Sequence, residues 1–213
     1  MKLTKRGEYA LRALIDFGIA YELGRPLVKI GELVRKENLP VKFLEQILMQ
    51  LREAGFIEAK RGKGGGYLLA KPPKEIRFGQ VIRLIDGPLA PIACVSQTAY
   101  ERCTCPDEDH CGLRMLMLDV RNAIARILDR YVLADVVEIT LRKMRRDKVP
   151  IPFMVEKLLT SPPVNPSLYR EEGHPLGSFL QEMEDLSNLS SLVPSPEPAA
   201  PARSSSRRAK KDA

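Results

Sequence analysis

The segment from residue 56 to residue 70 constrains the fold more than any other part of the sequence. It reads FIEAK, RGKGGG and YLLA, so two short runs of strand-forming residues flank a basic tip whose glycines disfavour a helix. The segment before it predicts a helix that closes at Gly55, because four apolar residues recur at helical spacing. These residues are Leu44, Ile47, Leu48 and Leu51.

A shorter helix over KIGELVRKEN precedes that segment, and the turn Asn38-Leu39-Pro40 joins the two. Two helices joined by a tight turn and followed by a basic hairpin predict a winged helix-turn-helix. The alternative is a small helical domain with a flexible loop. A further helix is expected after Thr4, a suitable N-cap, and a short linking helix is expected over residues 77–87.

The net charge of +7 is concentrated at the N-terminal end of the chain. Residues 1–88 carry 17 Lys and Arg against 10 Asp and Glu, whereas the rest of the chain is close to neutral. This distribution indicates an anion-binding module, with nucleic acid as the first candidate. The chain has no Trp and only 6% aromatic residues, so stacking on single-stranded bases is poorly supported.

The sequence offers no sign of export or membrane insertion. Its apolar runs are shorter than a membrane span, and MKLTKRGEYA lacks the apolar core of a signal peptide. We therefore expect a cytoplasmic protein without a membrane partner. The motifs of common enzymes, such as GxSxG, HExxH and a glycine-rich nucleotide loop before a helix, are also missing, so an enzyme is not expected.

A long apolar stripe at helical spacing follows at residues 113–131. It consists of Leu113, Leu116, Met117, Val120, Ile124, Ile127, Leu128 and Tyr131. Packing of this stripe against a second copy of the chain predicts a homodimer. The alternative is that the stripe packs wholly within one subunit.

The expected fold is mainly α: a winged helix-turn-helix with a two-stranded wing and a long C-terminal dimerisation helix, followed by a disordered tail. The predicted parts are a DNA-binding domain (1–88), a cysteine-rich loop (89–112), a dimerisation helix region (113–146) and a Pro- and Ser-rich tail (147–213). Ten of the seventeen prolines follow Val149, which is typical of disorder.

Four cysteines lie within 18 residues, at Cys94, Cys103, Cys105 and Cys111. Without an export signal, clustered thiols favour metal or redox chemistry over disulfides. Four thiols could also form a structural zinc site, although zinc sites favour CxxC over the CxC spacing found here. Four ordinary reduced cysteines are the third possibility.

The run VKFLEQILMQLREAGFIEAKRGKGGGYLLAK resembles the recognition helix and wing of the Rrf-type bacterial repressors, which include IscR, NsrR and RirA. The opening MKLTKRGEYALRAL resembles their first helix, and ILDRYVLADVV resembles their C-terminal part, so the likeness covers residues 1–145. It implies a homodimer that binds a palindromic double-stranded DNA operator. The residues at the DNA-contacting positions are Lys42, Phe43, Glu45 and Gln46 on the recognition helix and Arg61 and Lys63 on the wing.

The sensing members of this family carry three cysteines ahead of the dimerisation helix. The resemblance therefore implies a 2Fe-2S or 4Fe-4S cluster on Cys94, Cys105 and Cys111, with Cys103 as an alternative ligand. Some members use a carboxylate of the partner subunit as the fourth ligand, and Glu8 occupies that position. Others use a His where this chain has Arg114, so His110 would be an out-of-register substitute.

The function implied is a transcriptional repressor whose DNA affinity depends on a cluster that senses redox state, nitric oxide or iron and cluster supply. The alternatives are a regulator of the same fold with zinc or no metal at the cysteine loop, and a non-regulatory protein that carries a cluster.

Overall fold

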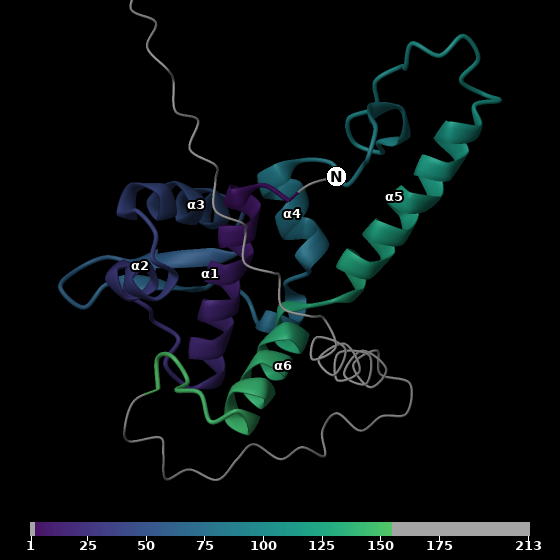
Figure 1. Cartoon of the computed structure of the whole chain (residues 1–213). Helices are drawn as coiled ribbons and strands as arrows, with labels where there is room; N and C mark the ends of the chain where they lie inside the picture. The colour runs from purple at the N-terminus through teal and green to yellow at the C-terminus, as the bar shows by residue number, and fades with distance from the viewer. Residues whose placement is uncertain (1–2, 155–213) are drawn as a thin grey trace, which may run out of the picture. The chain divides into compact units, whose positions relative to one another are not determined.

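The computed structural model describes residues 3–154 (Figure 1). The tail expected over 147–213 therefore lies almost entirely outside the described residues. The helices are α1 (Lys5–Glu22), α2 (Ile30–Glu37), α3 (Val41–Glu53), α4 (Phe78–Asp86), α5 (Gly112–Arg130) and α6 (Leu133–Arg146), and the strands are β1 (Ile57–Lys60) and β2 (Gly66–Leu69). Short 3-10 turns lie at Pro73–Glu75 and Ala93–Val95. No helix among residues 3–154 has the length and apolar character needed to cross a bilayer.

Capping residues and left-handed residues determine where α1 starts and where α2 and α3 end. The Thr4 hydroxyl accepts a hydrogen bond from the Gly7 N–H at 3.1 Å, as expected of an N-cap. Asn38 adopts a left-handed conformation (φ 51°) that ends α2 and opens the turn into α3. Gly55 (φ 71°) ends α3 in the same way. The predicted helix-turn-helix is therefore present.

The wing is an antiparallel hairpin of β1 and β2. Its register runs from Ile57 opposite Leu69 to Lys60 opposite Gly66. Val28, just before α2, adds a bridge to Tyr67 through hydrogen bonds of 2.9 and 2.8 Å. This bridge attaches strand β2 of the wing to the segment that leads into α2.

The core is built from α1, α3 and α6. The four apolar residues predicted to face inward from α3 are fully buried. Helix α6 packs along α1 so closely that a Cβ on Gly18 would lie 2.5 Å from the Val137 side chain (Figure 1). The glycine permits this close approach of the two helices.

The C-terminal region contains two helices rather than one continuous helix. Val132 is extended between them and bridges to Arg77, and the Leu133 N–H donates to the Ile76 carbonyl at 2.8 Å. Helix α6 consequently belongs to the core of its own subunit. Helix α5 packs against α4 and the Ala93–Val95 turn.

Four of the eight residues of the predicted apolar stripe are exposed on α5. Leu113, Leu116 and Ile127 are 56–57% exposed and Val120 is 37% exposed, and the neighbouring Met115 is also exposed. The described part of one subunit therefore leaves these side chains without a packing partner. Burial of such a large side chain is favourable by about 1.5–3 kcal/mol, so this face of α5 could gain stability from a packing partner beyond residues 3–154.

Candidate nucleic-acid interface and cysteine segment

The start of α3 presents a polar surface on a helix whose other face is buried. Lys42, Glu45 and Gln46 are exposed, whereas Leu44 and Ile47 between them are fully buried. The buried face fixes the rotation of the helix and aims the three polar side chains outward. These side chains can donate to or accept from the edges of base pairs.

Phe43, the fourth residue predicted on this surface, is half-buried instead of fully exposed. Its ring lies edge-on to the ring of Tyr9 on α1, with 5.9 Å between the centroids and 90° between the planes. The Arg12 guanidinium lies over the same Tyr9 ring at 5.3 Å. Phe43 thus fixes α3 against α1 as well as bordering the exposed surface.

The wing places two cationic side chains, Arg61 and Lys63, at an exposed tip. Gly62 needs a positive φ of 111° there, and a Cβ on Gly65 would lie 2.3 Å from the Lys60 carbonyl oxygen. The glycine run is therefore turn geometry, as expected, and it narrows the tip that carries the two cations. A narrow cationic tip suits the strongly negative minor groove of DNA.

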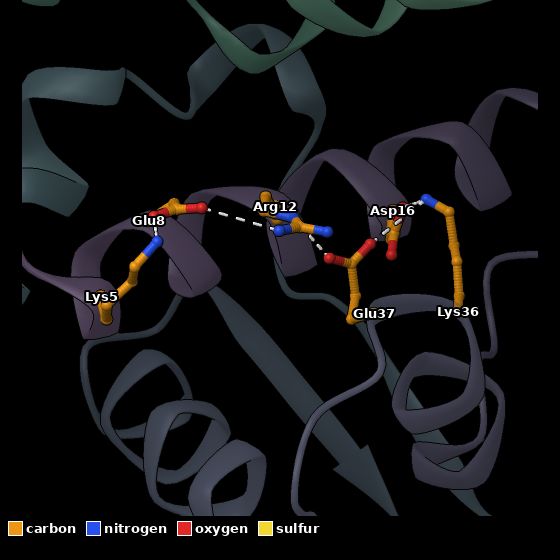
Figure 2. Close-up of polar contacts among 6 residues, drawn as sticks. All are labelled: Lys5, Glu8, Arg12, Asp16, Lys36 and Glu37. Atoms are coloured by element: carbon orange, nitrogen blue, oxygen red, sulfur yellow. Dashed lines mark hydrogen bonds and ion pairs between the residues drawn. The ribbon is translucent and has the colours of Figure 1, made fainter. Parts of the chain in front are cut away.

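A network of charged side chains connects α1 to the end of α2 (Figure 2). The Arg12 Nε lies 2.5 Å from Glu37 Oε2, and the Arg12 Nη1 lies 3.6 Å from Glu8 Oε1. Lys36 forms an ion pair with Asp16 and a longer one, at 3.7 Å, with Glu37. The side chains of Asp16 and Glu37 are 1% and 6% exposed, so two carboxylates are buried between the helices.

This network was not predicted from the sequence. The one available signal was Asp16, a carboxylate that follows the buried face of α1 between Ala13 and Phe17. A buried carboxylate requires a cation nearby. Which residue supplies that cation depends on the packing of α2 against α1.

Glu8, the predicted carboxylate ligand, lies at the outer end of this network. Its side chain is 38% exposed and accepts a hydrogen bond from Lys5 Nζ at 2.7 Å. That hydrogen bond lowers the pKa of Glu8 and keeps the carboxylate ionised. Within residues 3–154 of the same subunit, its charged partners are Lys5 and Arg12.

The four cysteines are reduced and lie between α4 and the start of α5. Cys94 is buried in the Ala93–Val95 turn, and Cys103, Cys105 and Cys111 are half-buried. Cys111 is the N-cap of α5, where its Sγ accepts a hydrogen bond from the Arg114 N–H at 3.4 Å. The Cys111 side chain thus caps the first turn of α5.

Neighbouring thiols interact in sequence: Cys94 with Cys103, Cys103 with Cys105, and Cys105 with Cys111. Burial raises the pKa of Cys94, and the neighbouring Cys103 raises it further. The backbone N–H of Cys105 donates to the Cys103 sulfur and lowers the pKa of that thiol, whereas the Cys103 side chain raises the pKa of Cys105 to about 11. The pKa of Cys94, Cys103 and Cys105 thus each depends on a neighbouring cysteine.

His110, the out-of-register candidate ligand, and Arg114, which stands where other members have a His, both have other partners. His110 is 85% exposed and its Nδ1 contacts Asp107 at 2.7 Å. The Arg114 Nε lies 3.2 Å from a Glu108 oxygen and 3.4 Å from the Cys94 carbonyl oxygen. Arg114 therefore holds the start of α5 against the cysteine segment.

The donor set of this segment is compatible with an iron–sulfur cluster. All four candidate donors are thiols on one segment, and interactions between successive thiols connect them. Iron–sulfur clusters take thiolate ligands. Among residues 3–154, however, no three His, Cys, Asp or Glu side chains are already arranged to hold a metal ion.

Known proteins resemble this chain both in sequence and in fold. The family model described as "Rrf2: Iron-dependent Transcriptional regulator" matches residues 3–139. An rrf2-like HTH-type transcriptional regulator of Rhodobacter capsulatus is 36% identical over 135 residues, which are 62% of this chain and 90% of that protein. IscR of Serratia proteamaculans is 33% identical over 138 residues, which are 64% of this chain and 79% of that protein.

Among solved structures, CymR of Bacillus subtilis, described as the global cysteine regulator of that organism, has a TM-score of 0.55 and 27% identity. The match covers 65% of this chain and 98% of CymR. The family and these relatives are transcriptional regulators. Since the family model spans more than half of the sequence, the chain belongs to the Rrf2 family of transcriptional regulators.

Proposed function

We propose that a homodimer of this chain binds a palindromic operator in double-stranded DNA and acts as a repressor in the cytoplasm. The observation that carries this proposal is the pairing of an exposed polar start of α3 with an exposed cationic wing tip on one bridged unit. A helix of this kind reads the major groove while the tip contacts the adjacent minor groove.

The residues of this surface have different roles in the proposal. Gln46 can bond adenine bidentately, Glu45 can accept from a cytosine amino group, and Lys42 can reach guanine or phosphate. Arg61 and Lys63 contribute charge at the wing. Phe43 contributes mainly through its packing on Tyr9.

Quantitative gel shifts across a salt series test these roles. Gln46→Ala should relax base preference, with about 1–3 kcal/mol less discrimination at one position. Lys63→Ala should weaken binding to all sequences alike and reduce the salt slope by about one unit. Equal loss of specificity from both substitutions would show that the roles are misassigned.

The dimer is proposed on the exposed stripe of α5. Leu113, Leu116 and Ile127 lie along one face of a 19-residue helix, which is about 28 Å long. Two copies packed along this face would present two recognition helices related by a two-fold axis. The operator should then contain half-sites about one helical turn apart or a multiple of it.

The proposed cofactor is an iron–sulfur cluster held by Cys94, Cys105 and Cys111, with Cys103 as the alternative thiolate. Glu8 of the partner subunit would complete the ligand set. The bound cluster would supply a group whose loss or alteration by nitric oxide, oxidants or iron shortage is chemically easy. The description of the family as iron-dependent supports this proposal.

Within the chain, Glu8 belongs to the charge network that reaches the end of α2. If Glu8 left Arg12 to serve as a ligand, Glu37 would be the carboxylate that still pairs with Arg12 within residues 3–154. This exchange would transmit the state of the cysteine segment to the helix-turn-helix. A coupling of about 1–3 kcal/mol is enough to change DNA affinity substantially.

Anaerobic purification with iron and sulfide analysis and an absorption spectrum tests the cofactor. Cys111→Ala should abolish iron and sulfide binding, whereas Glu8→Ala should leave the cluster labile or change its spectrum. Arg12→Ala is a useful comparison because it disturbs the same network without removing a proposed ligand. A normal cluster and a normal DNA response in Glu8→Ala would exclude the cross-subunit ligand.

A regulator of the same fold with structural zinc or no metal at residues 94–111 is the second candidate. The lack of a preformed group of three ligands in the described part of the chain favours its metal-free form, whereas the four clustered thiols favour its zinc form. The same elemental analysis distinguishes these cases, because zinc without sulfide, or neither, would replace iron and sulfide.

A further inference from the structure

Arg121 is a buried arginine without a partner. Its side chain points from α5 and the residue is only 8% exposed. Its Nε and Nη1 atoms are buried and make no hydrogen bond within residues 3–154, and no ion pair of this residue is found there. A buried cation is unfavourable unless an anion accompanies it. The described residues therefore supply no negative group to balance the charge of Arg121.

Arg121 lines a small cavity, open to solvent, between α4, α5 and the segment after Cys94. Ser96, Gln97 and Thr98 also line it and bring hydroxyl and amide donors. The Ser96 Oγ accepts the Ala99 N–H at 3.0 Å, which leaves its hydroxyl proton free to donate. These donors line the same cavity as the unpartnered guanidinium.

The second arginine of the cavity, Arg83, is already neutralised. Its Nη1 and Nη2 donate to the two carboxylate oxygens of Asp129 at 2.6 and 2.7 Å. No acidic side chain lines the cavity among the described residues, so the charge of Arg121 remains uncompensated inside it.

We propose that this cavity binds a small oxoanion with the chemistry of inorganic phosphate or sulfate, and that Arg121 is its principal ligand. A guanidinium donates two parallel hydrogen bonds to such an anion, and nearby hydroxyl groups can bind its remaining oxygens. The phosphates of a DNA duplex are excluded, because a side chain that is 92% buried is out of their reach. The site is therefore separate from the proposed operator-binding surface.

The bound anion would connect three elements of the chain. It would bridge α5, through Arg121, to the 96–98 segment that directly follows Cys94, beside the Arg83 end of α4. Binding should therefore stabilise the folded protein by mass action.

Thermal unfolding of the full chain, followed by circular dichroism, tests the proposal. Sodium phosphate or sulfate is titrated against sodium chloride at constant ionic strength and constant protein concentration. The wild type should show a saturable rise in Tm with phosphate or sulfate. Arg121→Met should lose this response, and Arg126→Met, an exposed arginine on the same helix, should keep it.

Thr98→Val provides a second variant in case Arg121→Met does not fold. It removes one donor from an exposed position of the rim and should raise the anion concentration at half-saturation several-fold. Isothermal titration calorimetry with phosphate should give the same order of affinities. An equal Tm response in all variants would identify a general salt effect and overturn the proposal. A wild type without any response would also overturn it, as expected if a carboxylate of the partner subunit pairs with Arg121.

Discussion

Lys36→Met removes the cation that accompanies the buried Asp16. The Asp16 side chain is 1% exposed, and its second carboxylate oxygen has no hydrogen-bond partner in the described chain (Figure 2). Loss of one partner from a buried ion pair costs about 3–5 kcal/mol. Because the Lys36 side chain is 32% exposed, water can partly replace its charge, and we expect a loss of about 3 kcal/mol in the free energy of unfolding. The pKa of Lys36 is lowered by burial, which shows that its charge is already partly desolvated.

Urea unfolding followed by circular dichroism at fixed protein concentration measures this loss. Lys60→Met, an exposed lysine on β1, is the matched control and should change the free energy of unfolding by less than about 0.5 kcal/mol. Adding Asp16→Asn to Lys36→Met removes the stranded charge and should recover at least half of the loss. A Lys36→Met loss equal to that of the control, or no recovery in the double variant, would refute the reasoning.

Three further predictions follow from the wing, α5 and α4. Gly65→Ala places a Cβ 2.3 Å from the Lys60 carbonyl oxygen, so operator affinity in gel shifts should fall about tenfold with little loss of Tm; unchanged affinity would contradict the proposed role of the wing tip. Ile127→Glu should halve the mass measured by light scattering while the helical circular dichroism signal is kept, and a stable dimer would show that α5 is not the interface. The Arg83 hydrogen bonds lower the pKa of Asp129 below its ordinary 3.8, so the stability that Asp129 contributes is present above that pH and is lost as the pH falls through the lowered value. Asp129→Asn should therefore lower the urea midpoint more at pH 7 than at a pH low enough to protonate Asp129, and an equal effect at both would exclude this ion pair as the cause.

Local sequence signals were sufficient for the elements of the winged unit. Thr4, Asn38 and Gly55 mark helix ends through hydrogen bonding and left-handed conformations that depend on single residues. The apolar spacing in α3 predicted its buried face, because residues three and four positions apart lie on the same face of a helix. The exposed positions of Lys42 and Gln46 follow from that same spacing, so this part of the candidate DNA surface could be read from the sequence.

The division of the C-terminal region was not evident from periodicity. The apolar spacing continues to Tyr131, yet the chain becomes extended at Val132 because that residue bridges to Arg77, 55 positions earlier. Helix α6 then packs along α1, where Gly18 leaves room for Val137. A contact between residues so far apart in the chain leaves no local signal in either segment.

The sequence by itself determined the winged helix-turn-helix, the cationic N-terminal unit and the clustering of the four thiols, because spacing, capping and charge act over a few residues. Only the tertiary structure decided that Arg12 and Lys36 neutralise the carboxylates of Glu37 and Asp16, and that Arg121 lies buried without an anion. The physical reason is that the free energy of a charge depends on its burial and on its partners. Both are set where helices distant in sequence pack together.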